Sequence, residues 1–146
     1  MNTQTIGIIV GGLLPALLYG LTAVLTKAST KAGIGIGMYL ILVGIACVLA
    51  GAGFFFLSPD RTVSMRSALY AFGVGLTWGI GTGLVAIGLT TYGIPIAKLT
   101  PLYNMNTLIA VLLALWIFAE WQEVRVTQLL IGSILIVIGG TLVARA

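Results

Sequence analysis

Side chains capable of acid–base, nucleophilic or metal chemistry are scarce in this sequence. It contains one cysteine, Cys47, no histidine, and three acidic residues, Asp60, Glu120 and Glu123. The acids lie at the edges of apolar segments, so they form neither a catalytic carboxylate pair nor a zinc site. Cys47 lies within an apolar run and is expected to be a small packing residue. We therefore expect no enzymatic activity, no metal and no cofactor.

Polar residues, together with one proline, are instead concentrated in one apolar stretch, residues 96–119. The set comprises Lys98, Thr100, Pro101, Tyr103, Asn104, Asn106 and Thr107. At about 100° per residue, Thr100, Tyr103, Asn104 and Thr107 would share one side of a helix. Pro101 has no backbone N–H and therefore predicts a kink. Because kinked, polar helices form midplane sites in transporters, this segment is the predicted pathway for a small-molecule solute.

Lys98 is the one ionisable residue well inside an apolar run. At 1.5 Å per residue it lies about 7 Å beyond the Gly93–Pro95 break. Its ammonium group either extends to the membrane interface or lines the pathway, and both interpretations stay open. Tyr19 and Trp78 are also predicted to line the pathway, with ordinary helix packing as the alternative. Tyr39 is expected to be an aromatic anchor at the membrane interface.

The composition requires lipid as the main solvent for these side chains. The 146 residues are 60% hydrophobic and 7% charged, and the mean hydropathy is +1.18. A soluble domain carries about 25% charged residues. This excludes a soluble enzyme, a disordered tail and a nucleic-acid-binding module. The basic residues are scattered singly, so we expect no nucleic acid partner.

Five apolar stretches are long enough to cross a bilayer, which requires about 20 residues in a helix. They cover residues 5–26, 35–57, 67–91, 96–119 and 126–143. Their continuous hydrophobicity excludes barrel strands, which alternate polar and apolar residues. The predicted fold is an all-α membrane protein with five transmembrane helices, forming a single domain over residues 1–146 in the lipid bilayer.

The basic residues give almost no cue to orientation, although short loops rich in Lys and Arg normally stay in the cytoplasm. With five spans, one side holds Arg61, Arg66 and Arg125, and the other holds Lys27, Lys31 and Arg145, with Lys98 near it. Two interpretations follow from this balance: insertion in both orientations, or a fixed topology set by weak cues.

Small residues recur at the spacing of one helix face. Ala71, Gly75, Gly79 and Gly83 are four residues apart, and Gly132 and Gly139 are seven apart. Because small residues let helix backbones approach closely in lipid, Gly75, Gly79 and Gly83 are predicted to be packing positions.

From Trp78 to Ala144 the sequence resembles the second part of an EamA domain, from the drug/metabolite transporter superfamily. A small and aromatic span is followed by a short turn, a span that bears Pro101 and ends in Glu120, and a final glycine-containing span. Tyr19-Gly20 followed by Lys27 is similar to the start of the family's domain, although many relatives have Trp where Tyr19 stands.

The resemblance implies one EamA-like half-transporter repeat in the cell inner (plasma) membrane. Two copies would then form a homodimer, parallel or antiparallel, that moves a metabolite or drug-like solute by alternating access. The balanced charges favour the antiparallel pair independently. Two other functions stay open: a flippase for lipids or lipid-linked sugars, and a regulatory or structural membrane subunit that does not transport.

Overall fold

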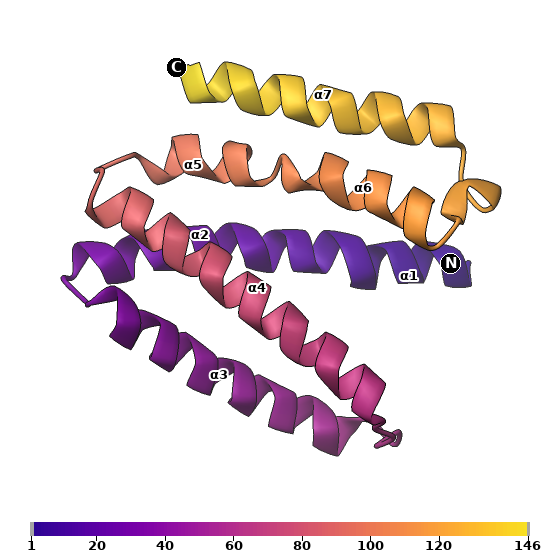
Figure 1. Ribbon diagram of the computed structural model, residues 1–146, viewed down its shortest axis with the longest axis horizontal. Coiled ribbons are helices and arrows are strands. Elements are labelled where there is room, and N and C mark those ends of the chain that lie inside the picture. Colours follow the sequence, from indigo (N-terminus) through magenta and orange to yellow (C-terminus); the bar gives the residue numbers. More distant parts are fainter. Residues whose placement is uncertain (1, 146) are drawn as a thin grey trace. The chain divides into compact units, whose positions relative to one another are not determined.

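The computed structural model describes residues 2–145, and within that range every regular element is a helix. Five helical segments are long and apolar enough to cross a membrane: Thr3–Lys31, Ile36–Leu57, Met65–Thr90, Ile96–Ile117 and Val126–Arg145. The predicted all-α fold with five spans is therefore confirmed. The chain forms two compact units, Met1–Gly93 and Ile94–Ala146, whose helices are labelled in Figure 1.

The first span consists of α1 (Thr3–Ile8), a π-helical segment (Ile9–Leu13) and α2 (Leu14–Lys31). The helix continues for five residues beyond the predicted apolar span, which ends at about residue 26. Lysine is a good helix former, and its charge is favourable near a helix C-terminus, so Lys27 does not stop the helix. The chain turns at Gly33, whose φ of +88° is readily available to glycine.

The second and third spans form an antiparallel pair, α3 (Ile36–Leu57) and α4 (Met65–Thr90) (Figure 1). Ser64 caps α4 by accepting a hydrogen bond from the Ser67 amide at 3.2 Å. The Ser67 hydroxyl in turn accepts one from the Ser64 amide at 2.9 Å, which completes a capping box. These bonds satisfy amide groups that the first turn of a helix leaves free.

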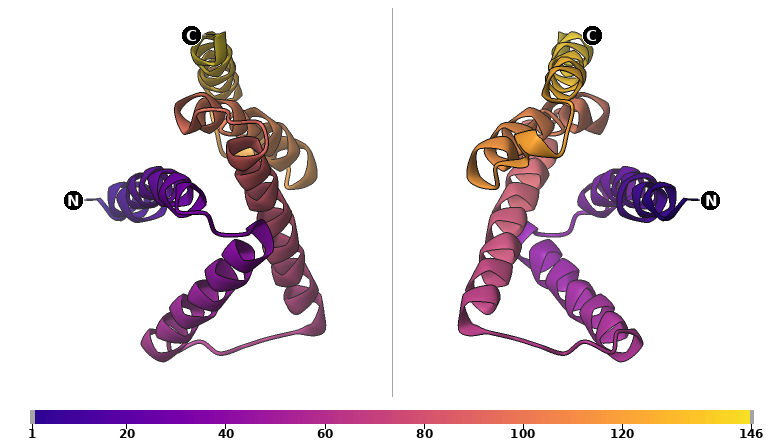
Figure 2. Two further views of the ribbon diagram at one scale, coloured as in Figure 1. Left: turned by 90° about the vertical axis from the view of Figure 1, so that its left-hand side faces the viewer. Right: turned by 90° about the vertical axis from the view of Figure 1, so that its right-hand side faces the viewer.

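α3 and α4 pack closely at one end only. Gly83 of α4 is buried, and a Cβ atom there would lie 3.2 Å from Leu40 Cδ1. Towards the connection between them the two helices diverge (Figure 2). Ala86, one turn after Gly83, is fully buried. The interior of this unit is thus made largely of small side chains, as expected for helices that associate in lipid.

The second unit contains α5 (Ile96–Tyr103), α6 (Asn106–Ile117), a 3₁₀ turn (Glu120–Gln122) and α7 (Val126–Arg145). α7 packs against both α5 and α6. The predicted kinked span over residues 96–119 consists of two helices, α5 and α6, separated by a short turn, and it ends at Ile117. Ala119 follows with a positive φ of 56°, which turns the chain towards α7.

Large apolar side chains are exposed along the spans of both units. Trp116 is 76% exposed and Val48 is 72% exposed. In water such surfaces would drive aggregation, whereas lipid solvates them. The chain is a multi-pass membrane protein.

Candidate functional site

The fourth span is interrupted in its middle, between Tyr103 and Asn106. The backbone tightens there: the Met105 amide donates to the Leu102 carbonyl at 3.1 Å, and the Thr107 amide donates to the Asn104 carbonyl at 3.1 Å. Both bonds span three residues rather than the four of an α-helix. The predicted kink at Pro101 therefore takes the form of a break that begins one turn after the proline.

The break lies deep within the span. α5 contributes 8 residues before it, and α6 contributes 12 residues after it. At 1.5 Å per residue the break is about 12 Å from one end of a hydrocarbon layer about 30 Å thick. Backbone that leaves the regular helix at this depth is tolerated where it is covered by protein or lines a wet cavity.

Two of the predicted site residues form a hydroxyl pair on α5. The Thr100 hydroxyl donates to the Ile96 carbonyl at 2.9 Å, and the Tyr103 hydroxyl donates to Thr100 Oγ1 at 3.3 Å. Both side chains are half-buried. The structure thus brings together the first half of the predicted polar sector.

The second half of the sector lies at the break. The Thr107 hydroxyl donates to the Asn104 carbonyl at 2.8 Å. Asn104 and Asn106 are both exposed on the surface of this unit. A carboxamide is costly to leave in hydrocarbon, so these two side chains require water, a solute or further protein groups beside them.

Lys98 lies in the first turn of α5 and is half-buried. Its position agrees with either of the two predicted roles, since the first turn is near the membrane surface and the side chain is long.

The backbone of Pro101 also takes part in a close helix contact that the sequence pattern did not indicate. A Cβ atom at Gly140 of α7 would lie 2.9 Å from the Pro101 carbonyl oxygen and 3.3 Å from Met105 Cγ. Only a glycine allows α7 to approach the broken helix so closely. The predicted small residues of α7, Gly132 and Gly139, have no neighbour within 4 Å of such an atom. The close approach thus occurs one residue after Gly139.

Among the glycines of α4 too, some are in close contact with another helix and others are not. Gly83 contacts Leu40, whereas Gly75 and Gly79 have open space within the described part of this chain. Of the three predicted packing positions, only Gly83 is thus in close contact with another helix among the described residues.

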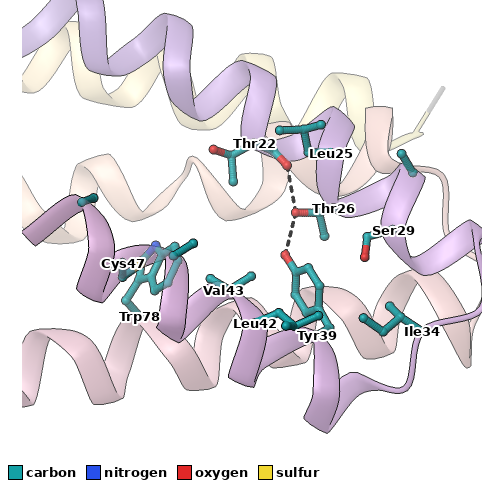
Figure 3. A pocket seen from close by; sticks show the side chains of 13 residues that line it. Thr22, Leu25, Thr26, Ser29, Ile34, Tyr39, Leu42, Val43, Cys47 and Trp78 are labelled. Atoms are coloured by element: carbon teal, nitrogen blue, oxygen red, sulfur yellow. Dashed lines mark hydrogen bonds between the residues drawn. The ribbon is translucent and has the colours of Figure 1, made fainter.

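The first unit contains a cavity of about 700 Å³ among α2, α3 and α4 (Figure 3). Trp78 lines it, as do Thr26, Tyr39 and Cys47. Tyr19 is not among the lining residues and is 68% exposed. Cys47 is exposed to this cavity rather than packed within the helix bundle.

At the centre of this cavity is a pair of hydroxyl groups that the sequence analysis did not select. Thr26 Oγ1 and Tyr39 Oη are 2.8 Å apart, and the Thr26 hydroxyl is also 2.8 Å from the Thr22 carbonyl to which it donates. Tyr39 is 6% exposed, so it is a buried partner of α2 rather than an interfacial anchor. The available signal was the four-residue spacing of Thr22, Thr26 and Thr30, which places three hydroxyls on one face of α2.

Among residues 2–145, no three His, Cys, Asp or Glu side chains gather where they could hold a metal ion. No protein-family model, no curated protein and no solved structure matches this chain. The similarity to the EamA domain therefore stays a prediction from the sequence.

Proposed function

We propose that this chain is a subunit of a membrane transporter that moves a small solute past the break between α5 and α6. The observation that carries this proposal is the position of the break, about 12 Å into the span, with exposed carboxamides beside it. Interrupted helices whose free backbone and polar side chains face a solute are a general feature of transporters. The resemblance to the EamA domain supports the same function.

The proposal includes a second copy of the chain. Asn104 and Asn106 are exposed in the second unit, and lipid alone cannot satisfy their hydrogen-bonding groups. A second chain would cover the side of Asn104, which it shares with Thr100, Tyr103 and Thr107, and enclose a pathway between the two copies. A homodimer, in either relative orientation, is the simplest assembly that does so.

Flux through the reconstituted full chain tests the transport proposal. The probes are radiolabelled neutral amino acids, hexoses and nucleosides, each offered to liposomes that contain the protein. Asn104→Leu is expected to abolish uptake of the transported class without changing the helical content. Lys98→Ala decides between the two roles of Lys98, because only a pathway residue is needed for flux.

The matched control is Thr77→Val, which removes a hydroxyl that donates at 2.9 Å to the Gly73 carbonyl of its own helix. This variant is expected to retain uptake. Wild-type uptake by Asn104→Leu, or no uptake of any probe by the wild-type chain, would contradict the proposal.

Disulfide trapping tests the homodimer. Cys47 is the one cysteine of the chain, so Cys47→Ala supplies a cysteine-free background. Gly79 lies near the middle of α4 and has open space beside it. Gly79→Cys in this background is expected to give an oxidised dimer, whereas Leu84→Cys, on a different side of α4, is expected to stay monomeric. Equal trapping at both positions would indicate random collision rather than an interface.

A further inference from the structure

The cavity among α2, α3 and α4 is an open groove with the volume of a small-molecule site. Its volume of about 700 Å³ lies within the range of ligand pockets, about 300–1,000 Å³. Its walls are mainly aliphatic and include Leu25, Leu42, Val43 and Ala46. All of the lining residues belong to the first unit.

The lining contains no lysine, arginine, aspartate or glutamate. Lys27 and Lys31 belong to α2, but neither of them lines the cavity. An ion transferred into such surroundings loses its hydration without gaining a counter-charge, at a cost that strongly disfavours binding. The occupant is therefore uncharged.

The hydrogen bonds show what the occupant must supply. A threonine hydroxyl has one proton, and that of Thr26 is donated to the Thr22 carbonyl at 2.8 Å. Tyr39 must therefore be the donor in its 2.8 Å bond to Thr26, and the Tyr39 oxygen keeps its acceptor capacity. The Ser29 hydroxyl and the Trp78 indole N–H also line the cavity, and the structure pairs neither with another described residue.

These groups distinguish between possible occupants. Acyl chains of lipids fill apolar space but cannot accept hydrogen bonds, which would leave the indole N–H of Trp78, near the middle of α4, unsatisfied in the hydrocarbon. In the view of Figure 3, Trp78 and Ser29 lie on either side of the Thr26–Tyr39 pair, so polar groups occur along the length of the cavity. We propose that this cavity binds an uncharged amphiphile, with an apolar ring body against the aliphatic walls and oxygen atoms that accept from Ser29 and Trp78.

This proposal goes beyond the transport function, since binding in the first unit is measured without flux. The probe is 9-anthracenemethanol, an uncharged ring compound with one hydroxyl that quenches tryptophan emission by energy transfer. The chain has three tryptophans, and Trp116→Phe with Trp121→Phe leaves Trp78 alone as the reporter. In nanodiscs, we expect quenching of Trp78 that saturates with probe concentration.

The matched control retains Trp116 instead, by Trp78→Phe with Trp121→Phe. Trp116 is 76% exposed and does not line the cavity, so its quenching is expected to consist mainly of the linear part caused by probe dissolved in the lipid. 9-Methylanthracene, which lacks the oxygen, is expected to bind Trp78 about fivefold more weakly, as for the loss of one hydrogen bond. The 9-anthracenecarboxylate anion is expected to show no saturable binding.

Substitutions in and beside the cavity test whether the probe binds there. Ala46→Phe fills the cavity and is expected to abolish saturable quenching, whereas Ala52→Phe, on the same helix but outside the lining, is expected to preserve it. Ser29→Ala is expected to weaken 9-anthracenemethanol about fivefold and to leave 9-methylanthracene unchanged.

Linear quenching at both tryptophans, equal affinity for the two uncharged probes, or saturable binding that survives Ala46→Phe would each overturn the proposal. So would a wild-type dimer that excludes the probe and becomes monomeric on Ala46→Phe, because a second copy of the chain would then occupy the cavity.

Discussion

The bond between Thr26 and Tyr39 is directional, because the single proton of Thr26 is already committed to the Thr22 carbonyl. Removing one partner is therefore not equivalent to removing the other. Thr26→Val leaves the buried Tyr39 hydroxyl as a donor without an acceptor, at a cost of about 1–3 kcal/mol. Tyr39→Phe leaves Thr26 bonded to Thr22 and is expected to cost about 1 kcal/mol. Free energies of unfolding in micelles measure the difference.

The double variant supplies the control. With Tyr39→Phe already present, Thr26→Val strands no buried donor, so its additional cost is expected to fall below its cost in the wild-type chain. Strictly additive effects, or a larger loss from Tyr39→Phe than from Thr26→Val, would contradict the assigned direction of the bond.

Asp60, in the connection between α3 and α4, accepts two hydrogen bonds from Thr62. The Thr62 amide donates to Asp60 Oδ1 at 3.0 Å and the Thr62 hydroxyl donates at 2.9 Å, which lowers the pKa of this carboxyl below its usual 3.8. Thr62→Val removes the hydroxyl alone and is expected to raise the pKa part of the way back. Carboxyl ¹³C NMR titration measures it.

The direction of the pH effect follows from the lowered pKa. A carboxyl with a lower pKa in the folded state contributes stability at pH values above its unfolded pKa. That contribution is lost as the pH falls through the folded value, and for this exposed group it is small. An unchanged Asp60 pKa in Thr62→Val would show that the amide bond alone causes the shift.

The polar residues of the fourth span could be predicted from the sequence, because the sequence itself shows which residues interrupt an apolar segment. The Thr100–Tyr103 contact also agrees with simple helical spacing. The role of Tyr39 could not be predicted, because a tyrosine at the start of a span usually extends to the interface. Its burial depends on α2, which brings Thr26 beside it.

At the scale of the elements, the number of spans was predictable but their internal breaks were not. Hydrophobicity over about 20 residues measures length, and it is insensitive to a local change from four-residue to three-residue hydrogen bonds. Pro101 indicated a disturbance, but the break follows at Asn104 and Met105, where the backbone bonds tighten. The close approach of α7 at Gly140 depends on this local geometry and on the packing of two helices.

Gly140 provides the test of that approach. Gly140→Ala would place a methyl group 2.9 Å from the Pro101 carbonyl oxygen, so α7 must shift and the unit is expected to lose about 1–3 kcal/mol of stability. Gly139→Ala is the matched control, because its methyl group meets nothing within 4 Å. Thermal unfolding of both variants measures the difference, and equal midpoints would exclude the tight contact.

The turn after α6 contains a residue other than glycine with a positive φ angle, Ala119. Ala119 has a φ of 56°, in the left-handed region that costs a residue with a Cβ atom about 1–2 kcal/mol. Ala119→Gly is expected to recover about 1 kcal/mol, whereas Ala110→Gly within α6 is expected to lose a similar amount. Chemical unfolding of the two variants checks the opposite signs. A loss of stability in both would argue against the left-handed turn.

At the scale of the whole molecule, the structure leaves the balance of basic residues unchanged, because the five spans separate the same connections as predicted. If each span crosses the membrane once, Arg61, Arg66 and Arg125 are expected on one side, and Lys27, Lys31 and Arg145 on the other, with Lys98 close to it. A chain with such a balance is expected to insert in both orientations, which an antiparallel homodimer requires.

A reporter fused after Ala146, active on only one side of the membrane, tests this expectation. The wild-type chain is expected to give signal with both a cytoplasmic and a periplasmic reporter. Because basic loops stay in the cytoplasm, Arg61→Gln with Arg66→Gln is expected to place the C-terminus there. Lys27→Gln with Lys31→Gln removes the same number of charges from the other side and is expected to export it. Each double variant removes two positive charges. If the loss of charge alone decided the orientation, both double variants would place the C-terminus on the same side. A C-terminus on one and the same side in all three proteins would exclude dual insertion and leave a parallel pair as the form of the proposed dimer.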